Sequence, residues 1–335
     1  MTKLTIKEVA KAAGVSTATI SRVLNENGYV SEEARRRVLE TIERLHYKPN
    51  TIARSLKQDR SGGIGFVLPD LTNPYFMRIA RALHNRLAGE GYYVFFMDSD
   101  EEPEKEREAL NFLLEKRVEA ILLAGTGGNL ELIRRIQAGG TPLVLLDRQL
   151  PGVPADAVME DNETAAEEAV MYLLDKGHRT VGVLNGPAGI STAAERARGA
   201  LKALTVRGME AHTEYSYYGD YTRNSGKRAA KYFLELPVPP TAVFSANNEM
   251  TFGFLLGLKE NGLPIDHMEL VSFGGLDFAS LFRHRLTAIR QEPDAVAEAA
   301  AELLLRRIRE PESAGKREKR LLVPRLEVSP ASEDG

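Results

Sequence analysis

The chain contains no cysteine, which excludes disulfide bonds, thiolate nucleophiles and cysteine-ligated metal sites. No stretch approaches the roughly 18 consecutive apolar residues of a membrane-spanning helix. The first residues, MTKLTIKEVAK, lack the apolar run of an export signal, so we expect a cytoplasmic protein without membrane contact. The 335 residues are 43% hydrophobic and 27% charged, which is typical of a globular protein of two or three domains.

Signatures of catalysis are also missing. The histidines are scattered without a His-x-x-x-His pair, and the sequence has no Gly-x-Ser-x-Gly or Walker motif. The run GTGG at 125–128 lacks the glycine spacing of a dinucleotide-binding fingerprint. We therefore expect no enzymatic activity, no cofactor and no bound metal.

Negative charge slightly exceeds positive charge overall, but positive charge is in excess at one end. The whole chain has a formal net charge of −3. Residues 1–60 hold 12 Lys and Arg against 7 Asp and Glu, a net of +5, whereas residues 61–335 hold 32 against 40, a net of −8. A basic head on an acidic body suggests a nucleic-acid module joined to another function, although a solvated surface would have the same composition.

The basic head has the pattern of three short helices. Thr5 and Glu8 have the spacing of a capping box, so a helix is expected to begin near Ile6. Gly14 breaks that helix, and Ser16 can cap a second one. A third helix is expected after Ser31, with Ala34, Val38, Leu39, Ile42 and Leu45 on its buried side.

The second of these helices has an outward side made of short or fork-shaped side chains. They are Thr17, Ala18, Ser21, Arg22 and Asn25. Arg22 could bond a guanine with both ends of its guanidinium group, and the hydroxyls could bond bases or phosphates. This side favours a helix-turn-helix that reads the DNA major groove over an interaction module without nucleic acid.

The segment YKPNTIARSLKQDR, residues 47–60, follows the head. Pro49 stops the preceding helix, and Asn50 can cap a new one over about 51–56. Such a helix is far shorter than the ~12–15 residues needed for marginal stability in isolation. The segment is therefore either a plain linker or a helix that folds on DNA, with Leu56 as an apolar wedge in the minor groove.

Apolar runs and helical patterns alternate through the remaining residues. Strands are expected at 62–70, 92–100, 118–125, 141–147, 179–185, 241–247 and 268–274. Helices are expected at 74–91, 103–117, after 129, and at 162–176, 191–207, 222–235, 247–262 and 293–309. This alternation predicts two parallel sheets of βαβ units, with a cleft at the carboxyl ends of their strands.

The heptapeptide STATISR within GVSTATISRVLN, followed by YKPNTIARSL, resembles the signature of the lactose/galactose-repressor family of bacterial transcription regulators. The similarity continues through PDLTNPYF, LLDR, MEDNETA, KGHRTVGVLNG, AERARGAL, GDYTRNSG and SANNEM. It implies an all-α helix-turn-helix domain at 1–47, a hinge helix and linker at 48–60, and an α/β body at 61–335. That body would have two parallel-sheet lobes, as periplasmic binding proteins do. The first lobe would comprise about 61–160 and 290–318, and the second about 161–289 and 319–330.

The function implied by this resemblance is repression of transcription. The protein would bind a palindromic double-stranded DNA operator as a homodimer, with affinity controlled by a small effector in the interlobe cleft. That effector would be a sugar, a sugar phosphate or a related metabolite. The alternatives are a regulator controlled by a protein co-regulator, and a solute-binding receptor or an enzyme with the same body fold. The tail lacks sustained apolar heptads, which favours a dimer over a tetramer.

The resemblance also assigns residues to the two sites. Base contacts fall on Thr17, Ala18 and Arg22, phosphate contacts on Thr5, Ser16, Thr19, Ser21, Asn25 and Tyr47, and the minor-groove wedge on Leu56. Effector contacts fall on Tyr75, Asp147, Arg148, Arg196, Tyr221 and Asn247, with Asp70, Asn73, Phe273 and Asp277 as further candidates. Arg196 could instead lie on a solvated helix face, and Tyr75 could be plain core.

Two positions depart from the family pattern. Gly274, in SFGGLD, and Asn248 stand where an aspartate is common in the family. Both changes remove negative charge from the expected cleft and would leave Arg148 and Arg196 less neutralised. We therefore expect an effector that is larger than a simple sugar or carries phosphate or carboxylate, unless Asp277 restores the lost acceptor.

Overall fold

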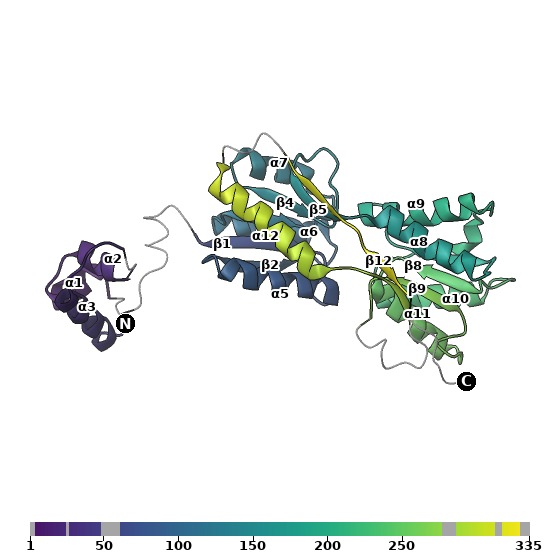
Figure 1. Ribbon diagram of the computed structural model, residues 1–335, viewed down its shortest axis with the longest axis horizontal. Coiled ribbons are helices and arrows are strands. Elements are labelled where there is room, and N and C mark those ends of the chain that lie inside the picture. The colour runs from purple at the N-terminus through teal and green to yellow at the C-terminus, as the bar shows by residue number, and fades with distance from the viewer. Residues whose placement is uncertain (1–3, 25–26, 48–60, 277–285, 312–316, 329–335) are drawn as a thin grey trace. The chain divides into compact units, whose positions relative to one another are not determined.

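The computed structural model describes residues 4–24, 27–47, 61–276, 286–311 and 317–328. These residues form two units, a head within residues 1–61 and a body within residues 62–335 (Figure 1). Asn25, Leu56, Asp277 and the expected hinge segment 48–60 lie outside the described residues. The roles expected for them therefore stay predictions from the sequence.

The described part of the head contains three helices, as predicted. They are α1 (Ile6–Ala13), α2 (Thr17–Leu24) and α3 (Glu32–Arg44). The capping box is present, because Thr5 and Glu8 each accept a hydrogen bond from the other's backbone N–H. Gly14 ends α1 at a φ of 65°, in the left-handed region that glycine adopts without a Cβ penalty. Ser16 Oγ accepts from the Thr19 N–H at 3.1 Å and so caps α2.

A small apolar core joins these helices. Its buried members are Val9, Ala10, Ala13, Ile20, Val23, Val38 and Tyr47. Leu39 was predicted to lie inside, but it is 50% exposed, and that prediction was wrong. The inward stripe of α3 runs through Val38, Thr41, Ile42 and Leu45 at three- and four-residue spacing, which leaves position 39 on the outer side.

The first lobe of the body is a parallel sheet with helices on both faces. Its described strands are β1 (Gly63–Leu68), β2 (Tyr93–Asp98), β3 (Ala120–Leu123), β4 (Leu143–Leu146), β5 (Asp156–Glu160) and β11 (Lys319–Leu322), in the order β11-β5-β4-β3-β1-β2. Alternate residues of the strands pack against α5 (Pro74–Ala88) and α12 (Pro293–Arg309) on one face, and against α6 (Pro103–Glu115) and α7 (Leu130–Ala138) on the other. The strands β1, β3 and β4 are buried along their whole length, which explains why they read as apolar runs.

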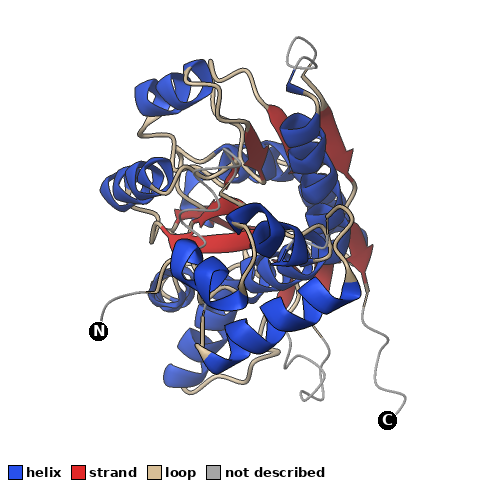
Figure 2. Cartoon of the chain, turned by 90° about the vertical axis from the view of Figure 1, so that its left-hand side faces the viewer, coloured by secondary structure: helices blue, strands red, loops and turns tan. Residues whose placement is uncertain are grey.

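The second lobe repeats this arrangement of strands and helices, and Figure 2 shows the chain coloured by these two kinds of element. Its described strands are β6 (Val181–Asn185), β7 (Ser216–Tyr218), β8 (Ala242–Ser245), β9 (Glu269–Phe273), β10 (Thr287–Arg290) and β12 (Arg325–Glu327), in the order β12-β10-β9-β8-β6-β7. All neighbours are parallel except β12, which pairs antiparallel with β10. The helices α8 (Asn162–Asp175) and α9 (Ser191–Val206) cover one face, and α10 (Arg223–Leu234) and α11 (Asn248–Glu260) cover the other. A short 3-10 helix, Thr213–Tyr215, precedes β7.

Three described segments connect the lobes, between β5 and α8, between β10 and α12, and between β11 and β12. The last connection corrects the predicted boundary. Residues from 319 onward were assigned to the second lobe, but Lys319–Leu322 pairs with β5 of the first sheet. The chain crosses after Leu322, and only β12 joins the second sheet.

The alternation of strands and helices predicted for the body is confirmed, but no ranges were predicted for β5, β7, β10, β11 and β12. The strand β5, DAVME, is fully buried although it begins and ends with a carboxylate. Arg307 of α12 compensates Asp156 with two hydrogen bonds of 2.6 and 2.7 Å. Because charged residues stand at both ends of β5, its sequence is not a continuous apolar run. The apolar pattern therefore does not reveal this buried strand.

Candidate functional site

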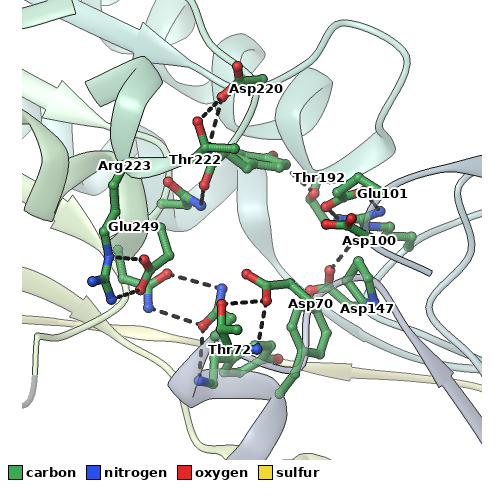
Figure 3. A pocket seen from close by; sticks show the side chains of 18 of the residues that line it. Asp70, Thr72, Asp100, Glu101, Asp147, Thr192, Asp220, Thr222, Arg223 and Glu249 are labelled. Carbon is green, nitrogen blue, oxygen red and sulfur yellow. Dashed lines mark hydrogen bonds and ion pairs between the residues drawn. The ribbon is translucent and has the colours of Figure 1, made fainter. Parts of the chain in front are cut away.

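The described part of the body contains a cavity of about 1090 Å³ between the two lobes. It lies where strands end: Asp70 comes after β1, Asp147 and Arg148 after β4, and Asn247 after β8. Figure 3 shows side chains around this space, among them Asp70, Asp147 and Glu101 from the first lobe and Thr222, Arg223 and Glu249 from the second. The predicted cleft at the carboxyl ends of the strands is therefore present.

The residues that the sequence nominated for effector binding come together in this cavity. Tyr75, Asp147, Arg148, Arg196, Tyr221 and Asn247 all line it, as do the further candidates Asp70, Asn73 and Phe273. They come from segments as far apart in the sequence as 70 and 273. The structure establishes their convergence, while their role towards an effector stays a prediction.

Arg148 is buried and already neutralised. Its two terminal nitrogens donate to the two carboxylate oxygens of Glu101, each at 2.6 Å. Asp147 lies beside it, with a carboxylate oxygen 3.7 Å from Arg148 Nε. The expectation that Arg148 would be poorly neutralised was therefore wrong. The sequence analysis missed Glu101, because nothing local marks a side chain that reaches from the loop after β2 to the end of β4.

Arg196 is also buried, so it does not lie on a solvated helix face. Its Nε donates to Asn162 Oδ1 at 2.9 Å, and Nη1 donates to the Ala246 carbonyl at 2.7 Å. The guanidinium carbon lies 3.6 Å from the centroid of the Phe273 ring, so the planar group stacks on it. These contacts from three segments fix the guanidinium group at the wall of the cleft.

Asp147 and Tyr221 reach the cavity from left-handed backbone, with φ of 63° and 67°. Burial raises the pKa of the Asp147 carboxyl above its usual range, and it likewise raises the pKa of the Tyr221 hydroxyl. The Tyr221 hydroxyl lies 3.3 Å from Thr192 Oγ1. Backbone strain of this kind persists where surrounding structure holds it, which is common at binding sites.

Tyr75 presents a buried hydroxyl that interacts with the carboxyl of Glu160 but makes no hydrogen bond of ordinary geometry among the described residues. Burial raises its pKa well above the usual range, so the hydroxyl stays protonated and can donate. Glu160, at the end of β5, is also buried, and burial raises the pKa of its carboxyl to about 7. It accepts a hydrogen bond from the Gln291 amide.

Asn247 and Asn248 begin α11 and have different partners. Asn247 Oδ1 accepts from the Met250 N–H at 2.8 Å as the helix cap, and its amide nitrogen donates to the Tyr221 carbonyl at 3.2 Å. Asn248 is directed at the first lobe, where its amide nitrogen donates to Asn73 Oδ1 at 3.1 Å. Asn73 returns a hydrogen bond to Asn248 Oδ1 at 3.4 Å.

The cavity wall is rich in carboxylates, and three of its four cations are paired with carboxylates. Eight carboxylates line it, from Asp70, Asp98, Asp100, Glu101, Glu102, Asp147, Asp220 and Glu249, against the four cations of Lys105, Arg148, Arg196 and Arg223. Lys105 pairs with Asp100 at 2.6 Å and with Glu102 at 2.9 Å, and Arg223 pairs with Glu249 at 2.5 Å. Such a wall suits hydroxyl groups, which carboxylates accept from, better than it suits a phosphate.

In the head, the side chains predicted to contact bases are exposed. Thr17, Ala18 and Arg22 all lie at the surface of α2, whereas Ser21 is half-buried. Ser16 Oγ and Thr19 Oγ1 lie 3.0 Å apart, within hydrogen-bonding distance, and Thr5 is bonded to Glu8. Tyr47 packs in the head core and is 8% exposed, which makes it the least accessible of the described residues predicted to contact phosphate. Tyr29, which the sequence analysis did not single out, is 91% exposed.

Two further findings concern membrane spans and metal sites. No helix among the described residues is long and apolar enough to cross a membrane. Within the same residues, no group of three or more His, Asp or Glu side chains is arranged to hold a metal ion.

Both parts of the chain match known families. Residues 5–50 match the bacterial regulatory proteins of the lacI family, and residues 61–325 match the periplasmic binding proteins and sugar binding domain of the LacI family. The chain is 32% identical over 308 residues to catabolite control protein A of Priestia megaterium, covering 90% of this chain and 91% of that protein. It is 32% identical over 305 residues to the transcriptional repressor CytR of Escherichia coli K12, covering 91% and 89%.

Solved structures agree with these matches. The lac repressor dimer bound to operator and the anti-inducer ONPF is 25% identical, with a TM-score of 0.83 and coverage of 99% of both chains. The complex of the transcriptional regulator CelR with cellobiose is 25% identical, with a TM-score of 0.71 and coverage of 97% of this chain and 98% of that one.

Proposed function

Because the chain belongs to the lacI family of bacterial regulatory proteins, we propose that it is a dimeric operator-binding repressor whose DNA affinity is controlled by a small molecule in the interlobe cleft. The observation that carries this proposal is the convergence of six nominated side chains on one cavity of about 1090 Å³. That volume suits a ligand of one or two sugar rings in size.

The effector is an uncharged molecule with several hydroxyl groups. Asp147 accepts hydrogen bonds from hydroxyls, Arg196 donates to a ring or hydroxyl oxygen, and Tyr75 and Tyr221 cover the apolar faces of a ring. A phosphate or carboxylate would meet an excess of carboxylates, because Arg148, Lys105 and Arg223 are paired with acidic residues. The charge of the lining therefore favours a neutral effector over the anionic one expected from Gly274 and Asn248.

The head supplies the output of this sensor. Thr17, Ala18 and Arg22 are the base-reading side chains of α2, and hydroxyl groups at its start approach the phosphates. Two heads related by the dimer axis read the two halves of a palindromic operator. A ligand that prefers one arrangement of the lobes changes the affinity of the heads for that operator.

The test compares two arginines on the same helix. Arg196→Lys removes the forked group that bonds Asn162 and the Ala246 carbonyl, while Arg198→Lys alters an exposed side chain paired with Glu163. Uncharged sugars, nucleosides and sugar phosphates are screened by thermal shift, and the ligand that stabilises the wild type is titrated by calorimetry. We expect Arg196→Lys to weaken its binding about tenfold or more, which is about 1.4 kcal/mol.

The Arg198→Lys variant is expected to keep wild-type affinity for that ligand. In a gel shift with a DNA site selected from random sequence, the ligand should change the operator affinity of the wild type. Stabilisation by sugar phosphates alone would contradict the neutral-effector proposal, and equal losses in the two variants would contradict the assigned site.

A further inference from the structure

A pair of buried amides joins the two lobes directly. Asn73 stands at the start of α5 in the first lobe, and Asn248 stands at the start of α11 in the second. Each donates to the other, at 3.4 Å from Asn73 and 3.1 Å from Asn248. Their residues are 9% and 8% exposed, so water contributes little to satisfying them.

The orientation of the Asn73 amide is set by a second bond. Asn73 Oδ1 also accepts from the Tyr75 N–H at 3.0 Å, because Asn73 is the cap of α5. Turning the amide over would leave that N–H without its acceptor. The Asn73 oxygen therefore faces the amide nitrogen of Asn248. Only a residue at position 248 that both donates and accepts can form the two hydrogen bonds of the pair.

Gly274 lies beside Asn248 on the second lobe and has a φ of +86°, which strains a residue with a side chain. A Cβ added there would lie 3.0 Å from Gln291 Oε1, a tight contact, and 3.5 Å from Asn248 Cβ, an ordinary van der Waals contact. Gly274 also lines a second cavity of about 610 Å³, whose wall shares Tyr75, Asn248 and Gln291 with the large cavity. Asn248 therefore borders both spaces, whereas Asn73 borders the large one.

We propose that the Asn73–Asn248 pair is a clasp that holds the two lobes together before any effector binds. Its hydrogen bonds are exchanged for bonds to water when the lobes separate, so the clasp biases the lobes without locking them. An effector in the large cavity then acts on lobes that are already joined, and its binding strengthens or opens this contact. The regulatory consequence rests on the proposed function, but the clasp itself does not.

The experiment measures the separation of the lobes in the full-length protein without effector. Because the chain has no cysteine, Glu108→Cys on α6 and Lys231→Cys on α10 introduce one spin label on each lobe without background. Labelled chains are diluted with unlabelled chains so that only distances within one chain are recorded. Pulsed electron paramagnetic resonance then gives the distance distribution between the lobes.

Asn248→Asp is the principal variant. It keeps an acceptor for the Asn73 amide but replaces the donor that faces Asn73 Oδ1 with an oxygen. We expect the distribution to broaden and shift to longer distances. Asn73→Asp, which keeps the cap of α5, should shift it in the same direction, and the double variant should shift it furthest.

Asn224→Asp is the matched control, because it places the same charge in the same cleft from an exposed position on α10. Its distribution should equal that of the wild type. Circular dichroism checks that each variant is folded. If Asn248→Asp does not fold, Asn73→Asp provides the test. Unchanged distances in the folded variants would overturn the clasp. Separated lobes with unchanged operator affinity would support the clasp and contradict the proposed control of DNA binding by the lobes.

Discussion

Several single residues at the cleft have an unfavourable backbone conformation or a buried charge. Asp147 and Tyr221 adopt left-handed backbone, which costs on the order of 1–3 kcal/mol for a residue with a side chain. Arg148 is buried, and Glu101 compensates it from another loop. Asp147, Tyr221 and Arg148 all line the cavity, so the strain and the buried charge are concentrated where a ligand would bind.

Glu160 provides a prediction at this scale. Burial raises the pKa of its carboxyl from 4.5 to about 7, so the folded chain holds the proton more tightly than the unfolded chain does. The contribution of Glu160 to the free energy of unfolding is therefore full below about pH 4.5 and is lost as the pH rises through 7. The loss is on the order of 3 kcal/mol.

Urea unfolding between about pH 5 and pH 8 checks this prediction. Glu160→Gln should be less sensitive to pH than the wild type over that range, because its amide does not titrate and can still accept from Gln291. Glu168→Gln, on the exposed side of α8, should follow the wild type. Parallel curves for all three proteins would contradict the raised pKa.

At the scale of elements, close contacts at glycine join the helices of the second lobe. A Cβ added at Gly226 of α10 would lie 2.1 Å from the Met250 carbonyl oxygen of α11, and one at Gly253 would lie 1.9 Å from the Arg223 carbonyl oxygen. Gly199 of α9 makes a similar approach, 2.1 Å from the Glu163 carbonyl oxygen of α8. These contacts allow α11 to place Asn247 and Asn248 at the cleft.

Gly226→Ala should therefore lower the free energy of unfolding by about 1–3 kcal/mol or more, because backbone on α11 cannot move away from the added methyl group. Gly189→Ala is the control, since nothing lies within 4 Å of a Cβ there. It should change stability by about 0.5 kcal/mol or less. Urea denaturation measures both, and equal effects would show that the glycine contact does not limit the packing of α10 on α11.

At the scale of the whole molecule, charge and connectivity separate the DNA-binding head from the sensing body. The +5 of residues 1–60 attracts phosphate, although the full chain has a net charge of −3. Three described crossings tie the lobes together. Along the chain, the segment that contains Leu56 joins the head to the body.

Leu56→Ala tests that connection. We expect operator binding to weaken by about tenfold or more, because an apolar wedge between base steps contributes contacts that alanine cannot make. Effector affinity in the body should stay nearly unchanged. A gel-shift titration and calorimetry measure the two quantities, and wild-type operator affinity in the variant would contradict the wedge.

The sequence by itself determined the local structure. Capping residues such as Thr5 and Ser16 set the starts of the first helices, and apolar runs marked most of the buried strands. It also nominated Tyr75, Asp147, Arg196 and the other residues of the effector site, because the resemblance is carried by short motifs that contain them. Those features depend on neighbours along the chain or on a motif.

Only the tertiary structure decided what these residues contact. It placed Glu101 on Arg148, which neutralises that arginine, and it paired Asn248 with Asn73 across the lobes. It moved Lys319–Leu322 into the first sheet and buried β5 behind the ion pair of Asp156 and Arg307. Each of these contacts joins residues distant in sequence, and their partners follow from how the sheets and helices pack rather than from any local pattern.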